Sequence, residues 1–180
     1  MTIYTIGHSQ IAIERFVHLL RLHQIQLLID TRSQPYSRYA PQFNRESLKT
    51  MLHQAGMAYL YLGDQLGGRP RDTQYYLPDV GVDYDRLAAA PFYREGMERL
   101  KREAERRCLA IMCSEADYHA CHRYKLISRS LVNEGVKVYH ILHSGELDLT
   151  DLNDFRPVPH QPDLFEERGG KSARFAALHR

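Results

Sequence analysis

The sequence lacks tryptophan altogether and has only three cysteines among its 180 residues. An odd, small number of cysteines argues against a disulfide framework and predicts reduced thiols in a reducing compartment. No uncharged apolar run approaches the roughly 18 residues that a membrane-spanning helix needs. The first residues show no basic stretch followed by an apolar core, so no secretory signal is predicted. These absences favour a cytoplasmic protein that does not enter a membrane.

An excess of charge of one sign is also missing. The 24 Lys and Arg residues nearly balance the 22 Asp and Glu residues, and the net charge of +2 neither requires nor excludes binding to nucleic acid. A composition with 43% hydrophobic and 26% charged residues is typical of a globular chain. The length suits one domain with a tail.

Short apolar runs alternate with helical patterns along most of the chain. The apolar runs predict strands at 3–6, 25–29, 57–62, 109–112 and 136–142. Apolar residues at helical spacing predict helices over 12–23, 45–55, 91–106 and 118–134. Asn44 and Gly56 suit the N-cap and the C′ position of the second of these helices.

Strands that alternate with helices predict a three-layer, Rossmann-like α/β domain with about five mainly parallel strands. We expect the strand order 3-2-1-4-5, with the first and fourth strands side by side at the centre. The domain is expected to span 1–145, and residues 146–180, whose later part is rich in Pro, Arg and Gly, to form an extended C-terminal tail. Ligands of such sheets bind at the carboxyl ends of the strands, so polar residues there are candidates for a site.

Reactive side chains are densest in residues 112–123, directly after the fourth predicted strand. Cys121 would lie in the first turn of a helix beside His122 and Arg123, where the helix N-terminus and neighbouring cations lower a thiol pKa and favour the nucleophilic thiolate. Glu115 follows a buried strand and suits a general acid or base. The sequence leaves open whether Cys121 or Glu115 carries the reaction.

The ends of other strands contribute further candidate residues, and several candidates also have a purely structural interpretation. His8 follows the first strand and could act as base for the thiol, as could His122, while Asp30 follows the second strand and could orient His8 or an arginine. Cys121 could instead pack as a small buried hydrophobe, and Cys113 favours an inert core thiol. Glu115 could equally be an N-cap or a salt-bridge partner.

Arginines gather in the strand-end connections and predict an anionic ligand. Arginine binds phosphate or carboxylate through a bidentate fork, so a phosphorylated small molecule or a nucleic acid is expected, with scattered surface arginines as the alternative. The candidate anion-binding residues are Arg32, Ser33, Arg38, Arg69 and Arg123. No Walker loop and no G-x-G-x-x-G is present, so nucleotide hydrolysis by those routes is unsupported. A metal site is a third option, since His8, Cys113, Glu115, Cys121 and His122 include suitable ligand types. No paired Cys-x-x-Cys or His-x-x-x-His spacing occurs, so no metal ligand is assigned, and the cofactor is left unknown.

Five motifs occur in order at residues 5–9, 28–38, 43–44, 62–70 and 112–123. They resemble the bacterial and archaeal family catalogued as domain of unknown function 488. Members commonly have Val where Thr31 stands and Pro where Tyr118 stands, and neither position is a candidate catalytic group. The resemblance implies an α/β domain with one strand-end site built from these motifs, and it supplies no reaction. The implied site comprises His8, Asp30, Arg32, Arg38, Glu115, Cys121, His122 and Arg123.

The tail contains a separate motif, Gln-Pro-Asp-Leu-Phe at 161–165. It resembles the pentapeptide with which bacterial replication and repair proteins dock on the β sliding clamp. Leu164 and Phe165 would fill an apolar pocket and Gln161 would anchor by hydrogen bonds. The alternative is that Leu164 and Phe165 pack on their own domain.

Three functions follow from these features. The first is an enzyme that acts on a phosphorylated or nucleic-acid-linked substrate through a Cys/His/Glu site with an arginine anion cradle. The second is a non-catalytic nucleic-acid or sliding-clamp adaptor in DNA maintenance, and the third is a thiol or sulfur-transfer enzyme. The first is favoured, because reactive groups converge at the strand ends; the oligomeric state is not predicted.

Overall fold

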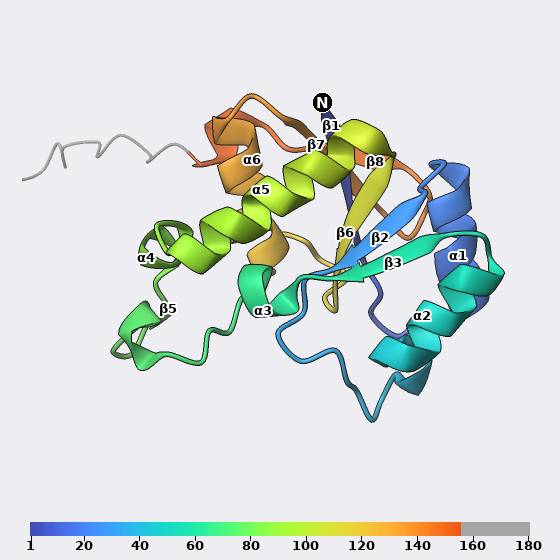
Figure 1. Ribbon diagram of the computed structural model, residues 1–180, viewed down its shortest axis with the longest axis horizontal. Coiled ribbons are helices and arrows are strands. Elements are labelled where there is room, and N and C mark those ends of the chain that lie inside the picture. Colours follow the sequence, from blue (N-terminus) through green and yellow to red (C-terminus); the bar gives the residue numbers. More distant parts are fainter. Residues whose placement is uncertain (156–180) are drawn as a thin grey trace, which may run out of the picture.

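A mixed sheet with the strand order β3-β2-β6-β1-β7-β8 forms the centre of the fold, and the computed structural model describes residues 1–155 (Figure 1). The strands are β1 (Thr2–Gly7), β2 (Leu27–Asp30), β3 (Ala58–Tyr61), β6 (Leu109–Cys113), β7 (Lys137–Ile141) and β8 (Leu147–Leu149). Every neighbouring pair is parallel except β7 and β8, which are antiparallel. The prediction of a mainly parallel α/β fold is therefore confirmed.

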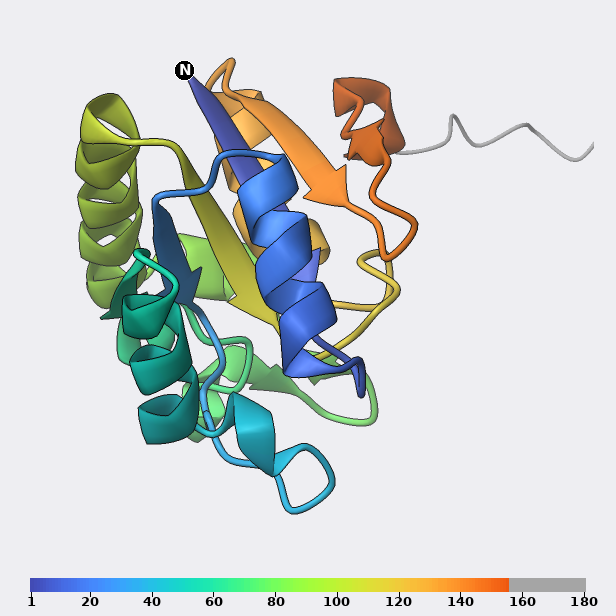
Figure 2. The same cartoon turned by 90° about the vertical axis from the view of Figure 1, so that its right-hand side faces the viewer.

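Helices cover both faces of this sheet (Figures 1 and 2). One face carries α1 (Ile13–Leu22) and α2 (Arg45–Gln54), and the other carries α5 (Pro91–Arg106) and α6 (Arg129–Asn133). The connection between β3 and α5 contains α3 (Gly63–Leu66), the hairpin of β4 (Tyr76–Leu77) and β5 (Gly81–Val82), and α4 (Tyr84–Ala88). None of the helices within residues 1–155 is long and apolar enough to cross a membrane.

Two apolar clusters hold the layers together, one on each face of the sheet. On the first face, Phe16 and Leu20 of α1 are fully buried against strand residues that include Leu28. On the second, Leu100 of α5 packs with Ile111 of β6. Each fully buried side chain of this size contributes about 1.5–3 kcal/mol through the hydrophobic effect, so amphipathic helices that cover the sheet stabilise it strongly.

The expected strand order is wrong at one point. The fourth predicted strand, β6, lies between β1 and β2 rather than outside β1. All five residues of β6 are buried, which fits a strand with neighbours on both sides and helices on both faces. Alternation along the chain sets handedness but not which gap a later strand fills, so the sequence pattern could not decide this. The consequence is that the end of β6 is flanked by the ends of both β1 and β2.

Two local features differ from the sequence-based expectation. The helix expected over 118–134 begins only at Arg123, with a π-helical turn over Arg123–Ser128 that continues into α6. Tyr118 is instead held by stacking on His140 and by a 2.6 Å hydrogen bond to Asp148, which keeps the preceding stretch out of the helix. Asn44 makes no side-chain cap, because its Oδ1 accepts a hydrogen bond from the backbone N–H of Ser37.

The end of the folded part lies beyond residue 145. That expected domain boundary falls between β7 and β8, and Tyr139, His140 and Ile141 of β7 pair with residues of β8. A short 3-10 helix follows at Leu152–Phe155. The sheet therefore continues past the boundary that the fading hydrophobic pattern indicated.

Candidate functional site

The polar groups predicted to form a site lie at the carboxyl ends of three adjacent strands. Cys113 ends β6, and His8 follows the end of β1, whose Gly7 is in register with Cys113. Asp30 ends β2 on the other side of β6. Backbone hydrogen bonds from His8 to Cys113 O (3.1 Å) and from Ser9 to Ser114 O (2.7 Å) hold the chain beyond β6 against the chain beyond β1.

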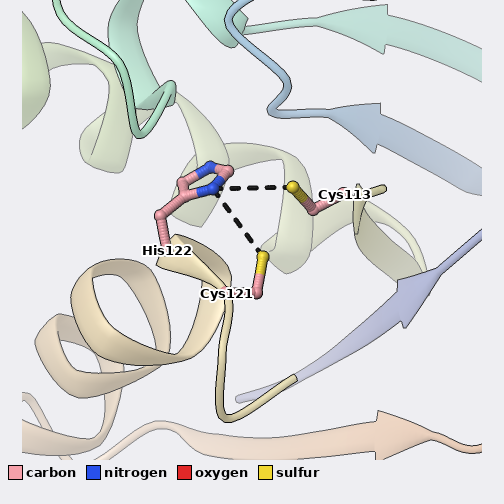
Figure 3. A group of neighbouring side chains, drawn as sticks. All are labelled: Cys113, Cys121 and His122. Carbon is pink, nitrogen blue, oxygen red and sulfur yellow. Dashed lines mark hydrogen bonds between the residues drawn. The ribbon is translucent and has the colours of Figure 1, made fainter. Parts of the chain in front are cut away.

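Two thiols, an imidazole and a carboxylate form one cluster beyond the end of β6. Figure 3 shows the ring of His122 directed at both sulfurs, with Nδ1 3.5 Å from Sγ of Cys113 and 3.7 Å from Sγ of Cys121. Both thiols are also within hydrogen-bond distance of Oε2 of Glu115, at 3.0 Å from Cys113 and 3.1 Å from Cys121. The thiols and the imidazole are buried, whereas Glu115 is exposed at the edge of the cluster. This cluster of Cys113, Glu115, Cys121 and His122 is the sulfur cluster of the following paragraphs.

Contacts between the Arg123 side chain and nearby backbone explain how Cys113 and Cys121, eight residues apart, come together. The guanidinium of Arg123 donates to the carbonyl oxygens of Glu115 (2.6 Å) and Ala116 (3.1 Å), which folds the 114–117 turn back over the start of the π-helical segment. Gly7 lies against the same turn so closely that a Cβ there would be 1.7 Å from the Glu115 oxygen. Only glycine leaves space for this approach. Arg123 is thus a buried support for the cluster rather than an arginine that faces an open surface.

Contacts within the sulfur cluster lower the pKa of Cys121 and of Glu115 and raise the pKa of Cys113. The hydrogen bond from Cys113 is the main cause that lowers the pKa of Cys121, to about 6, with His122 and Arg123 acting in the same direction against the effect of burial. The pKa of Cys113 is raised well above its ordinary value, first by its hydrogen bond with Cys121 and then by burial. Burial acts to raise the pKa of Glu115, but hydrogen bonds from both thiols outweigh it and lower the pKa to about 2. Cys121 is therefore the thiol that ionises near neutral pH.

A second, neighbouring network contains the predicted residues His8, Asp30 and Arg32. Arg32 forms a buried bidentate pair with Asp30, with distances of 2.9 and 2.7 Å, and also donates to the carbonyl of Phe43. The hydroxyl of Tyr59 donates to the same carboxylate at 2.7 Å. Since its donors are taken up by protein groups and its side chain is only 4% exposed, Arg32 acts in this structure as a support that joins the end of β2 to the loop containing Phe43.

His8 is held in its neutral form within this network. Its Nδ1 lies 2.7 Å from the carbonyl oxygen of Ser9, and Arg32 Nη1 lies 3.1 Å from its Nε2. Nδ1 therefore carries the proton, and the lone pair of Nε2 faces the guanidinium. Burial first, and then the charge of Arg32, lower the pKa of His8 to about 4.

The buried histidines predict how stability depends on pH. Burial is also the main cause that lowers the pKa of His140, which lies between the hydroxyls of Thr5 and Thr150, to about 3. Below pH 6.5 these two histidines bind protons in the unfolded chain but not in the folded protein, so their contribution to stability is complete above that pH and is lost as the pH falls. We expect the free energy of unfolding to decrease by about 1.4 kcal/mol per pH unit for each of the two histidines between pH 6.5 and 5.

Urea unfolding at intervals between pH 7 and 5 measures this dependence. His8→Gln should reduce the slope below pH 6 by about 1 kcal/mol per pH unit, because one of the two buried histidines no longer titrates. A stability that stays constant from pH 7 to 5, or an unchanged slope in the variant, would contradict the neutral, buried state of His8.

The remaining predicted anion-binding residues lie on a more open part of the surface. Arg69 and Arg38 are exposed, and the hydroxyl of Ser33 accepts a 3.0 Å hydrogen bond from the backbone N–H of Arg69. Ser33 and Arg69 line a cavity of about 600 Å³, whereas Arg38 is not among its lining residues. Its lining includes Ser33, Tyr61, Arg69, Arg71, Tyr75 and Phe92. Gln161, Leu164 and Phe165 of the tail motif lie outside the described residues.

The cavity and the sulfur cluster lie on either side of one short loop. Gly67 and Arg69 line the cavity, while a Cβ at Gly68 would be 2.4 Å from the ring of His122. Burial is the main cause that raises the pKa of Tyr84, the charges of Cys121, Cys113 and Glu115 raise it further, and Arg69 lowers it. The charges of both the sulfur cluster and Arg69 therefore influence the pKa of Tyr84.

Sequence reasoning missed several members of these networks. Cys113 was expected to be an inert core thiol, yet its thiol hydrogen-bonds to Glu115 and faces Cys121 and His122. Tyr59 and Tyr84 gave no signal, since Tyr59 stands in an apolar run and Tyr84 stands between two aspartates in the long connection before α5. Gly68 did leave a signal in the sequence, because a Gly-Gly pair before Arg-Pro indicates a close approach of the backbone to another group.

Comparison with known proteins gives one match. A family model described as domain of unknown function DUF488 matches residues 12–130. The matched range contains Asp30, Arg32 and the whole sulfur cluster, and it excludes His8. No curated protein and no solved structure matches the chain.

Proposed function

Since the chain belongs to the family catalogued as domain of unknown function DUF488, whose description contains no reaction, we propose from the site alone that it is an enzyme acting on a phosphorylated or nucleic-acid-linked substrate. In this proposal the sulfur cluster is the reactive centre, and the arginines beside the neighbouring cavity hold the anionic part of the substrate. The observation that carries it is the convergence of Cys113, Glu115, Cys121 and His122 at the carboxyl edge of a parallel sheet.

The roles of individual residues follow from their positions. Cys121 is the thiol that ionises, Cys113 stays protonated and donates to Glu115, and Glu115 is the exposed member that a substrate can reach. Arg69 is exposed at the cavity and is available to bind a phosphate through its fork. Ser33, Tyr61 and Tyr75 line the same cavity, where hydroxyl groups and aromatic rings suit a sugar phosphate or a nucleotide unit.

Ligand binding tests the anion-binding half of this proposal. A thermal-shift screen of phosphorylated metabolites, nucleotides and short oligonucleotides should identify a ligand whose affinity falls about 10-fold or more in Arg69→Ala, because a hydrogen bond to a charged group contributes about 1.5–3 kcal/mol. Arg102→Ala is the matched control, since this exposed arginine of α5 lies about 15 Å along the helix from Phe92. Equal loss in both variants, or no ligand from the screen, counts against the arginine cradle.

Turnover of the ligand so identified tests the catalytic half. Glu115→Gln and Cys121→Ser should abolish turnover, while Cys108→Ser, a thiol whose Sγ hydrogen-bonds elsewhere, to the carbonyl of His23, should preserve it. If both cluster variants leave binding and turnover unchanged, the sulfur cluster is not the reactive centre.

The low pKa of Cys121 favours a thiol or sulfur-transfer enzyme as a second candidate. In that case the thiolate of Cys121 attacks the substrate directly, and the arginines contribute little. Activity on uncharged substrates that is abolished by Cys121→Ser and unaffected by Arg69→Ala would identify this candidate. Activity that requires Arg69 would exclude it.

A further inference from the structure

Cys113, Cys121 and His122 direct two sulfurs and one ring nitrogen at a common point (Figure 3). The three atoms lie within 4.8 Å of one another, and Nδ1 is 3.5 and 3.7 Å from the two sulfurs. With Zn–S bonds of about 2.3 Å and a Zn–N bond of about 2.05 Å, tetrahedral coordination requires an S···N separation of about 3.6 Å. We propose that this cluster binds one Zn²⁺-like transition-metal ion through the two thiolates and Nδ1 of His122.

The other nitrogen of His122 has the partner that a metal-bound histidine needs. Its Nε2 lies 3.2 Å from the carbonyl oxygen of Thr31, which can only accept, so Nε2 carries the proton. In the neutral ring the lone pair of Nδ1 is then directed at the sulfurs, whereas in the imidazolium Nδ1–H donates to them. Metal-ligating histidines almost always donate their second N–H to a carbonyl or carboxylate in this way, because the contact fixes both tautomer and ring orientation.

The backbone around the cluster fixes its members before any ion is bound. Gly68 lies so close to the imidazole that a Cβ would be 2.4 Å from the ring, so the loop restrains the position of His122. The backbone N–H of Arg123 points at Sγ of Cys121 from 3.4 Å. A donor of this kind stabilises negative charge on the sulfur, which a metal-bound thiolate requires.

A bound cation would also stabilise the cluster electrostatically. Two sulfurs and the carboxylate of Glu115 face one another at 3.0 and 3.1 Å. Among residues 1–155, no side chain of lysine or arginine hydrogen-bonds to either sulfur or to that carboxylate. A divalent ion between these groups would permit both thiols to ionise together, which their mutual repulsion otherwise opposes.

Three protein ligands leave a fourth position, and Glu115 lies beside it. Its Oε2 is closer to the sulfurs than the roughly 3.6 Å that a tetrahedral oxygen ligand would need, so it must move outward by about half an ångström to coordinate. It would then be either the fourth ligand or the hydrogen-bond acceptor of a bound water. Three protein ligands with an open position are typical of catalytic rather than structural zinc sites. This inference does not rest on the proposed substrate class.

Titration with Zn²⁺ alone tests the proposal on the full chain, stripped with a chelator and kept reduced. Competition with a chromophoric chelator should show one ion bound per chain, with affinity about 100-fold lower or worse in Cys113→Ser and in Cys121→Ser. Cys108→Ser is the matched control and should bind as the original chain does, because the Cys108 thiol hydrogen-bonds outside the cluster. Absence of one-to-one binding, or binding that both cluster variants retain, overturns the proposal.

Replacement by Co²⁺ gives a second readout that requires no variant to fold. The protein should show intense thiolate-to-cobalt charge-transfer absorption together with the visible bands of tetrahedral Co²⁺. A weak spectrum typical of six oxygen or nitrogen ligands overturns the assignment. Because both experiments measure binding and not turnover, their result is independent of the outcome of the substrate screen.

Discussion

Asp30→Ala should lower the free energy of unfolding by about 3–5 kcal/mol, the largest loss of stability that we expect from one substitution in this site. The carboxylate is fully buried and forms the bidentate pair with Arg32, whose own side chain is 4% exposed. Removal of Asp30 leaves the guanidinium buried without a counter-charge, and Tyr59 also loses its acceptor. Since natural domains have only about 5–15 kcal/mol in total, this variant is expected to be close to unfolding.

Chemical denaturation compares this variant with two controls. Asp30→Leu combined with Arg32→Met should recover most of the loss, because an apolar pair of similar volume carries no desolvation cost. Glu46→Ala removes the exposed partner of Arg45 and should change stability by less than about 1 kcal/mol. If Asp30→Ala costs less than about 1 kcal/mol, the pair is not the strut between β2 and the loop that contains Phe43.

The parts of the fold that follow from local pattern were predicted from the sequence. Helix α2 lies within one residue of its expected bounds, and Gly56 has the positive φ of 79° that a C′ residue commonly takes. Helix α5 begins at Pro91, as a proline at the first helical position indicates. In these segments a single chemical feature decides the structure, and that feature is visible in the sequence.

Long-range features were not predictable in the same way. The position of β6 between β1 and β2 depends on which gap in the sheet a later strand enters, and β8 joins the sheet through only three exposed residues. The start of the helix after β6 depends on Tyr118, which stacks on His140 of a distant strand. None of these contacts leaves a periodic signal in the sequence.

The site shows the same division. Glu115, Cys121 and His122 are near one another in sequence, and the structure joins them in one cluster. The arginines could not be sorted from the sequence, because only the fold determines what a guanidinium faces. Arg32 and Arg123 bind protein carboxylate and carbonyl groups, whereas Arg38 and Arg69 are exposed. The anion cradle therefore reduces to the exposed arginines.

Cys121 belongs to the sulfur cluster, and its thiolate should dominate the chemistry of the metal-free protein. With a pKa of about 6 Cys121 is mostly ionised at neutral pH, whereas burial and the hydrogen bond with Cys121 keep Cys113 protonated. An ordinary thiol is ionised to only a few per cent at pH 7, so the thiolate fraction of Cys121 should be about 10-fold higher or more. Loss of the His122 ring should reduce that advantage, because His122 helps to lower the pKa.

The most direct measurement is the rate of alkylation of each cysteine by a small reagent as a function of pH, followed by mass spectrometry on reduced, chelator-treated protein. The midpoint of the profile reports the pKa of the thiol even where burial slows the absolute rate. We predict a midpoint near pH 6 for Cys121, a midpoint well above that of an ordinary thiol for Cys113, and an upward shift for Cys121 in His122→Asn. A Cys121 midpoint at about 8.5 or above, unchanged by the His122 substitution, would show that the sulfur cluster does not lower the pKa of Cys121.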